Sequence, residues 1–343
     1  MPKRLLIIFS AALIMCCACQ RKPPNNTGDE KGIIVIADSS DFVFLREELA
    51  RTFEREILTP WPEKIFALKQ IPVAQMRNHI LHPRLLLIGI LDSATPAAEK
   101  VKAMLTPEIE ARIRRGENYV FKKDDPWAKD QTLLVLSAVQ RDTLRHRIAA
   151  HRDELFEWFN QPLNEATQRV MFSQFEQREL GESLRRQYNW AVRIQHDYHL
   201  YKNLPGENFV MLRRSYPERW LMVSWQNAAT AKKLTPEAVV QWRNLLGKKF
   251  AEQDKVVENS LKMCEIEFAG YRAQEVQGLW ENERQVAGGP FKTWVFYDEN
   301  WRRLFLVDIA VFAPGKEKIK YLRQLEIMAR TFQAQPQNRE KVK

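Results

Sequence analysis

The sequence predicts an α+β fold of α/β layers, in which mixed, largely antiparallel sheets pack against helices. Two features support this class. In the first half of the chain, amphipathic stretches with helical spacing alternate with short apolar runs, and in the second half several such runs follow one another without a helix between them. Strands that follow one another closely pair antiparallel, because a parallel pair needs a long crossover connection. The roughly 310 residues after residue 31 are enough for one large or two medium-sized domains.

We divide the chain into six segments. They are a signal peptide (1–18), a lipidated flexible tether (19–31), a first α/β half (32–160), a helical connector (161–188), a second α/β half (189–334) and a disordered tail (335–343). The two halves end alike, because a tryptophan, a strand and a helix closing at a phenylalanine recur at Trp127 and Phe159 and at Trp301 and Phe332. This repeated ending leaves open that the halves arose by duplication.

In the first half, capping residues mark the starts of two helices. The polar residues 39–41 can cap one helix, and Thr106 followed by Pro107 favours the start of another. Pro162 is expected to end or bend a long helix at 141–159, and a further helical stretch runs to about residue 187. Strands are expected at 33–37, 65–68, 85–90, 119–122 and 132–138, with a helical turn at 73–80.

The second half is expected to be richer in strands. Thr235, followed by Pro236 and Glu237, favours a helix that reaches about Phe250. Strands are expected at 190–194, 208–213, 218–225, 263–268, 273–281, 291–297 and 303–312, before a final helix at 316–332.

The N-terminus has the order of a secretory signal. Cations precede an apolar run at 5–15, which is too short to span a bilayer, and a small residue, Ala18, precedes Cys19. Because the lipidated cysteine follows a small residue, Cys19 is the expected acylation site, in preference to Cys16 and Cys17. The alternative is an ordinary signal peptide with a chance cysteine. We therefore expect a lipid-anchored protein of the cell envelope, and the basic residues after Cys19 favour the periplasm-facing side.

The charge of the body is moderately basic. Removal of residues 1–18 leaves 51 of the 53 Lys and Arg residues against 43 Asp and Glu residues, a balance of +8. Such a balance favours contact with anionic lipids or acidic polymers, and export argues against nucleic acid as a partner.

Strong catalytic signatures are absent from the sequence. It contains no glycine-rich phosphate loop, no paired CxxC, no HExxH and no Gly-x-Ser-x-Gly motif. Two histidine pairs remain, His79 with His82 and His196 with His199 around Asp197. Pro83 disfavours helical geometry at His82, so a helix face shared with His79 is doubtful. A zinc site needs three or four convergent ligands, so we interpret His196 and His199 as surface-loop residues and expect neither a metal nor a cofactor.

Two isolated side chains of the second half have structural explanations. Asp308 interrupts the apolar run 304–312, where a buried carboxylate could have a raised pKa and act as an acid or base. We favour the structural alternative, in which Asp308 meets either an arginine or the solvent. Cys264 alternates with Ile266 and Phe268 along a strand, so a buried, unreactive thiol is expected.

Five short motifs follow one another in the second half. They are NFVMLR at 208–213, GLW at 278–280, GGPF at 288–291, FAP at 312–314 before Lys316, and Leu325 with Glu326. In this order and spacing the chain resembles the domain-of-unknown-function 4837 family of Bacteroidota lipoproteins, and the similarity is expected to cover the whole mature chain. Met211 stands where the family usually has tryptophan, and Gln277 where it has arginine, so any role of that arginine is lost. The resemblance implies an envelope lipoprotein and supplies no activity, ligand or catalytic residue.

Aromatic and cationic residues near the GGPF motif form a candidate ligand patch. The two glycines before Pro290 fit a tight turn between antiparallel strands. The patch consists of Arg213, Trp280, Gly288, Gly289, Phe291 and Trp294. It is suited to a sugar or an acidic polymer, although aromatic residues of strands also serve as core.

Three functions remain open. The leading hypothesis is a non-enzymatic binding or assembly module that contacts another envelope protein or a glycan. The alternatives are a hydrolase of an envelope polymer and a binder of anionic lipids or polymers. The hydrolase would act through carboxylates such as Glu281, Glu283, Asp298 and Asp308, which would have to lie about 5 to 9 Å apart in a cleft. We assign no catalytic residue.

Overall fold

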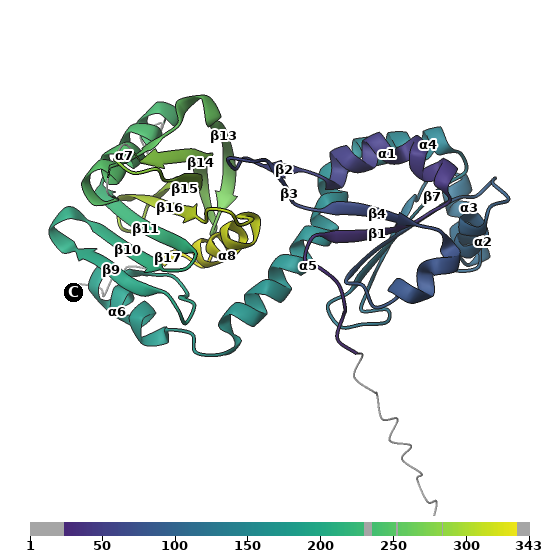
Figure 1. The fold of residues 1–343 in the computed structure, drawn as a ribbon, viewed down its shortest axis with the longest axis horizontal. Coiled ribbons are helices and arrows are strands. Elements are labelled where there is room, and N and C mark those ends of the chain that lie inside the picture. Colours follow the sequence, from purple (N-terminus) through teal and green to yellow (C-terminus); the bar gives the residue numbers. More distant parts are fainter. Residues whose placement is uncertain (1–23, 230–234, 252, 283, 335–343) are drawn as a thin grey trace, which may run out of the picture.

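The apolar runs form two separate sheets, each in its own domain, and the two domains lie side by side (Figure 1). The structure is a computed structural model that describes residues 24–229, 235–251, 253–282 and 284–334. The expected signal peptide, the acylation site Cys19 and the tail 335–343 lie outside these residues.

The first domain is built on a five-stranded, mostly parallel sheet. β1 (Gly32–Ile36) lies between β4 (Ala67–Ile71) and β5 (Arg84–Ile90) and pairs parallel with both. β7 (Thr132–Ala138) pairs parallel with β5, and β6 (Val120–Asp124) closes the sheet antiparallel. The three central strands are buried along their whole length, since helices cover both faces.

The helices of this domain form a layer on each face. One layer contains α1 (Ser39–Phe53), α4 (Arg141–Ala150) and α5 (Arg152–Ser173), and the other η1 (Val73–His79), α2 (Pro96–Lys102) and α3 (Pro107–Arg114). Thr106 caps α3 as expected, because its Oγ1 accepts a hydrogen bond from the Ile109 backbone N–H at 3.3 Å. Asp38 occupies the N-cap of α1, so residues 39–41 lie in its first turn instead.

Of the two effects expected of Pro162, an end or a bend of the helix, the structure rules out the end. Pro162 lies inside α5, and the helical run that starts at Arg141 breaks earlier, at His151, where the backbone leaves helical geometry. α5 thus continues beyond the first domain toward the second (Figure 1).

The second domain is built on an eight-stranded antiparallel sheet. Its strands are β9 (His199–Leu204), β10 (Phe209–Arg214), β11 (Glu218–Asn227), β12 (Asp254–Val256), β13 (Lys262–Phe268), β14 (Tyr271–Asn282), β15 (Gly288–Asp298) and β16 (Arg303–Phe312). The order is β12-β14-β15-β16-β11-β10-β9, and β13 also pairs with β14.

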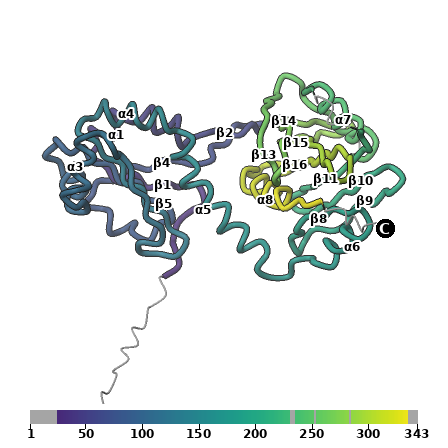
Figure 2. Tube along the Cα trace, turned by 180° about the vertical axis from the view of Figure 1, so that it is seen from behind, coloured from purple at the N-terminus to yellow at the C-terminus, as the bar shows by residue number. Residues whose placement is uncertain are grey.

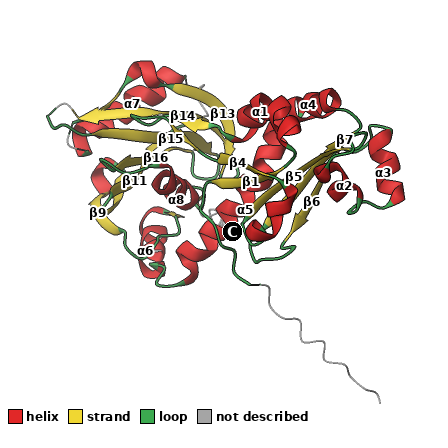
Figure 3. Ribbon diagram, turned by 45° about the vertical axis from the view of Figure 1, so that its right-hand side comes forward, coloured by secondary structure: helices red, strands yellow, loops and turns green. Residues whose placement is uncertain are grey.

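Helices cover both faces of this sheet as well (Figure 3). α7 (Pro236–Phe250) packs on the face that presents Trp280 and Phe291, and α8 (Ile319–Ala329) with α6 (Arg178–Tyr188) covers the face that presents Trp294. The alternation of side chains along β14 and β15 therefore separates the aromatic residues into two cores.

Short elements complete the chain and join the domains. A hairpin of β2 (Glu56–Ile57) and β3 (Glu63–Lys64) reaches the second domain (Figure 2), where the Glu63 carboxylate accepts hydrogen bonds from the Lys318 and Ile319 backbone N–H groups at the start of α8. The remaining elements are β8 (Trp190–Ala191), which pairs with β17 (Gln333–Ala334), η2 (Pro205–Glu207) and η3 (Glu258–Ser260).

The predicted α+β class is confirmed, because mixed and antiparallel sheets pack with helices. The strand orders of the two sheets differ, so a duplication finds no support in the topology. Within the ranges that the structure describes, no helix is long and apolar enough to cross a bilayer.

The expectation that Cys264 is buried is wrong. Among the described strands, its strand, β13, pairs only with β14, and it leaves most of its side chains exposed, Cys264 included. Burial of part of the thiol and the nearby Glu275 carboxylate both raise the pKa of Cys264, so the side chain is accessible but not activated.

Candidate functional site

A pocket opens on the face of the second sheet that α7 covers, and we call it the sheet-face pocket. Its volume is about 150 Å³. It is lined by Tyr201, Met211, Arg213, Glu218, Trp220, Phe250, Ala251, Asp254, Trp280, Asn282, Gln285, Ala287 and Phe312.

The aromatic wall of this pocket comes from strands that are distant in the sequence. Trp280 of β14 and Trp220 of β11 lie with their ring centroids 5.1 Å apart, and Phe312 of β16 is 6.2 Å from Trp280. Trp280 pairs in register with Gly289 of β15, which has no side chain to fill the space above it. A Cβ at Gly289 would lie 3.4 Å from the Trp280 Nε1 and only 2.0 Å from the Val311 carbonyl oxygen. The glycine therefore allows the indole ring to lie across the sheet.

The polar side of the pocket combines a cation, two carboxylates and amides. Arg213 donates from its Nη2 to Glu218 Oε1 at 2.7 Å, and its guanidinium lies 4.6 Å from the centre of the Tyr201 ring. Asp254 Oδ1 accepts a hydrogen bond from the Asn282 side-chain amide at 2.8 Å. Hydrogen-bond donors and acceptors thus surround one small space beside aromatic rings.

Three donors of this pocket have no partner in the described part of the chain. They are the Nε of Arg213 and the Nε1 atoms of Trp220 and Trp280, all three buried. Both tryptophans are almost fully buried, at 4% and 3% exposure. A buried N–H without an acceptor is costly, so native proteins rarely retain one without a reason.

The structure distributes the residues of the candidate patch over three places. Arg213 and Trp280 line the pocket, with Gly289 beside the indole ring. Phe291 is buried on the same face, where the Arg243 guanidinium lies 4.6 Å from its ring centre. Trp294 lies on the opposite face, stacked on Phe268 and bonded through Nε1 to Glu275.

The glycines at 288 and 289 do not form the expected tight turn. They begin β15, paired with Glu281 and Trp280, and neither has a positive φ angle. Glycine is needed at these positions because a side chain would not fit, not because the backbone is unusual. A Cβ on Gly288 would lie 2.8 Å from the Trp280 carbonyl oxygen.

Sequence reasoning missed most of the pocket. Trp220 stands directly opposite Arg213 in the β10–β11 register, and the short connection between these strands is a signal that could have predicted this pair. Asp254 and Phe312 come from segments whose approach depends on the order of strands in the sheet.

The carboxylates of the hydrolase hypothesis do not converge. Asp308 is fully buried on the α7 side, where Thr293 donates to it at 2.5 Å and Arg243 lies 3.4 Å away. Burial raises the pKa of Asp308, against the opposing effect of Arg243. Asp298 is buried elsewhere with Tyr271, and Glu281 is exposed beside Lys255. Glu283 lies outside the described residues. The expected arginine partner of Asp308 is thereby confirmed.

The histidine pairs take different positions. His196 and His199 are exposed and His79 is half-buried, whereas His82 is buried, with its Nδ1 3.1 Å from the Arg84 carbonyl oxygen. The expected surface position is confirmed for His196 and His199, and burial lowers the pKa of His82. Among the described residues, no three His, Cys, Asp or Glu side chains converge as metal ligands.

Fold and site together define an α+β protein with a ring-sized pocket on one face of an antiparallel sheet. Residues 176–331 match the model of the family described as domain of unknown function (DUF4837), which confirms the family resemblance for this part of the chain. Residues 26–172 match a different family model, described as domain of unknown function (DUF8532). The expected similarity over the whole mature chain is therefore limited to its second part.

Three solved structures match parts of this chain at low sequence identity. A protein from Bacteroides thetaiotaomicron is 10% identical with a TM-score of 0.29, over 44% of this chain and 47% of that one, so the chain spans about half of its length. The Saccharomyces cerevisiae Ran-binding protein Mog1p is 9% identical with a TM-score of 0.29, over 43% of this chain and 90% of its own. A mutant of protein Mog1 is 10% identical with a TM-score of 0.27, over the same shares. No curated protein matches the chain.

Proposed function

We propose that the second domain is a non-enzymatic binding module that accepts one ring of a neutral saccharide in the sheet-face pocket. The observation that carries this proposal is the meeting of two indole rings with three unpartnered N–H donors in one small pocket. A ligand that supplies acceptor oxygens to these donors would remove the unfavourable free energy of leaving them buried and unpaired.

The size of the pocket favours a single ring. A protein cavity of about 150 Å³ is known to take one benzene molecule, so the 150 Å³ here suit one six-membered ring. A pyranose has a six-membered ring, with C–H groups that pack on aromatic faces and with hydroxyl groups that extend from its edge. Ligand sites of this kind combine apolar walls with a few polar groups that fix orientation.

The charges of the pocket favour a neutral ligand over an acidic polymer. Arg213 is already paired with Glu218, and Asp254 adds a second carboxylate to the lining. An anionic group would meet two like charges, whereas a hydroxyl group can donate to a carboxylate and accept from an N–H donor.

Calorimetric titration of the full chain with the methyl glycosides of glucose, galactose, mannose and N-acetylglucosamine tests the binding. We expect saturable binding of at least one glycoside. Trp280→Ala and Arg213→Gln should each lower its affinity at least tenfold, because each variant removes one of the unpartnered N–H donors. Trp61→Ala is the matched control, since Trp61 is exposed in the β2–β3 hairpin and does not line the pocket. An absence of saturable binding for all four glycosides at tens of millimolar, or an equal loss in the control, would contradict the proposal.

We further propose that the chain is anchored in the cell envelope by acylation of Cys19, facing the periplasm. The support is the order of cations, apolar run and small residue before this cysteine. Mass spectrometry of the purified mature chain should find an acylated N-terminal Cys19, and Cys19→Ala should prevent acylation while Cys17→Ala does not. A mature terminus without fatty acid would refute the anchor.

A further inference from the structure

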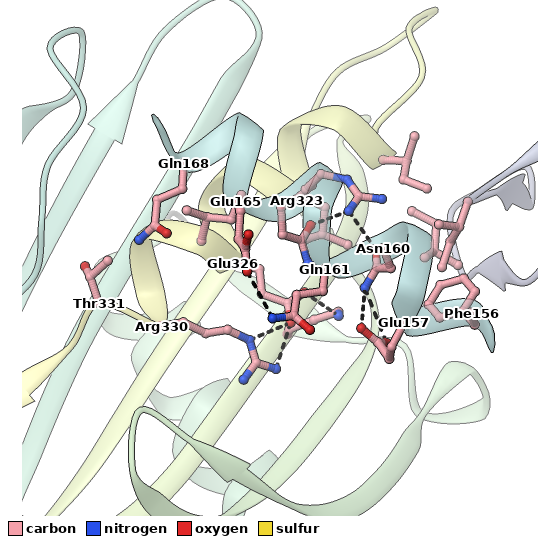
Figure 4. Close-up of a pocket in the computed structure, with 17 residues that line it drawn as sticks. Phe156, Glu157, Asn160, Gln161, Glu165, Gln168, Arg323, Glu326, Arg330 and Thr331 are labelled. Atoms are coloured by element: carbon pink, nitrogen blue, oxygen red, sulfur yellow. Dashed lines mark hydrogen bonds and ion pairs between the residues drawn. The ribbon is translucent and has the colours of Figure 1, made fainter. Parts of the chain in front are cut away.

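A larger cavity, of about 390 Å³, lies between the two domains (Figure 4), and we call it the domain-interface cavity. α5 of the first domain forms one wall, and α8 with Lys292 of β15 forms the other. Ile57, Phe156, Leu322 and Ile327 add apolar surface. The volume falls in the range of about 300 to 1,000 Å³ that small-molecule sites occupy.

The wall from α5 is polar and carries two carboxylates, Glu157 and Glu165. Its lining residues recur every three or four positions, so they share one face. The Asn160 amide donates to Glu157 at 3.1 Å, and the Gln161 amide donates to Glu165 at 3.0 Å (Figure 4). These neutral amides orient the two carboxylates on their own helix without neutralising their charge.

The wall from the second domain carries an excess of positive charge. Glu326 accepts from Lys292 at 2.7 Å and from Arg330 at 2.9 Å, so one carboxylate is shared by two cations. Burial alone would raise the pKa of Glu326, but the two cations outweigh it and lower the pKa to about 2.

Arg323 adds a third cation and has no carboxylate partner within ion-pair distance among the described residues. Its Nη1 donates to Asn160 Oδ1 at 2.8 Å and to Asn164 Oδ1, both on the opposite domain (Figure 4). Neutral amide oxygens orient the guanidinium without neutralising it, and the remaining N–H groups of its planar fork match the oxygens of a carboxylate or phosphate.

We infer that the domain-interface cavity binds the carboxylate or phosphate group of a small organic anion, which Arg323 holds together with Lys292 and Arg330. The apolar side chains named above would contact the uncharged part of this ligand. Because Arg323 is held by α5, a ligand on its guanidinium would contact both domains at once. This site is separate from the sheet-face pocket and does not depend on the function proposed for it.

The experiment measures the binding of two probes, phenyl phosphate and D-glucuronate, to the full chain by calorimetry at constant ionic strength. We expect saturable binding of at least one probe. Arg323→Gln should lower its affinity at least tenfold, since hydrogen bonds between charged groups are stronger than those between neutral groups. Binding of phenyl phosphate alone identifies a phosphate ligand, and binding of D-glucuronate alone identifies a carboxylate ligand. Arg323→Lys keeps the charge but loses the fork, and we expect it to bind more weakly than the natural chain and more tightly than Arg323→Gln.

The control is Arg272→Gln, which removes the same charge from an exposed arginine of β14 that pairs with Glu265. We expect it to bind both probes as the natural chain does. Failure of both probes to bind saturably, or an equal loss in Arg272→Gln, would overturn the inference. Neither result would bear on the sheet-face pocket, which Arg213→Gln and Trp280→Ala test with neutral glycosides.

Discussion

The ionised Glu326 carboxylate is predicted to stabilise the second domain, and the effect should depend on pH. Its pKa falls from 4.5 to about 2 on folding. Each pKa unit corresponds to about 1.4 kcal/mol, so the charged form contributes at most about 3 kcal/mol to the free energy of unfolding near pH 7. The side chain is 23% exposed, and solvent screening reduces this value to about 2 kcal/mol.

The sign follows from the direction of the pKa. Because the folded pKa is depressed, the stabilisation is fully present above pH 4.5 and is lost as the pH falls toward 2. The difference in the free energy of unfolding between the natural chain and Glu326→Gln should therefore be largest near pH 7 and fall to less than half of that value by pH 3.

Urea denaturation followed by tryptophan fluorescence measures this difference at each pH. Glu265→Gln is the matched control, since Glu265 forms an exposed pair with Arg272 and should change stability by less than about 0.5 kcal/mol at every pH. A Glu326→Gln effect that stays constant between pH 7 and pH 3 would refute the reasoning.

Three further predictions concern packing and access. Arg243→Met should lower the free energy of unfolding by about 3 to 5 kcal/mol, since it leaves the Asp308 carboxylate buried without its cation. The double variant Arg243→Met with Asp308→Leu should be less destabilised than Arg243→Met alone, and an equal or additive loss of unfolding free energy in urea denaturation would contradict this. Gly289→Ala should lower stability by about 1 to 3 kcal/mol or more, because its Cβ would meet the Val311 carbonyl oxygen at 2.0 Å, whereas Gly206→Ala, with nothing within 4 Å, should remain within about 0.5 kcal/mol; thermal unfolding of both variants decides this. Cys264 should react with a maleimide in the folded chain, as peptide mass spectrometry can show, and labelling that requires denaturant would disprove its exposure.

Local patterns were sufficient to predict many of the elements. Thr106 and Thr235 accept the hydrogen bonds expected of helix caps, because capping depends only on residues three positions away. The buried strands were also predictable, since an apolar run between turn signals is a local feature.

Positions that depend on strand order were not predictable. Trp220 and Trp280 meet only because β15 and β16 lie between their strands and carry small residues there, such as Gly289. The glycines were interpreted as a turn because glycine is common in turns, but the steric need for a bare backbone arises from a distant indole ring. Cys264 alternates with Ile266 and Phe268 like a core residue, and Phe268 is buried at one end of the strand, but Cys264 lies on the exposed part of β13.

The saccharide proposal is tested most directly at the indole N–H groups themselves. In a ¹⁵N-resolved NMR titration of the full chain with the tightest-binding methyl glycoside, the side-chain N–H resonances of Trp220 and Trp280 should shift together and saturate with one Kd. The Trp294 indole, which donates to Glu275 on the opposite face, should stay in place. Resonances of Trp220 and Trp280 that remain fixed while the glycoside binds, or that shift no more than that of Trp294, would contradict the sheet-face pocket as the binding site.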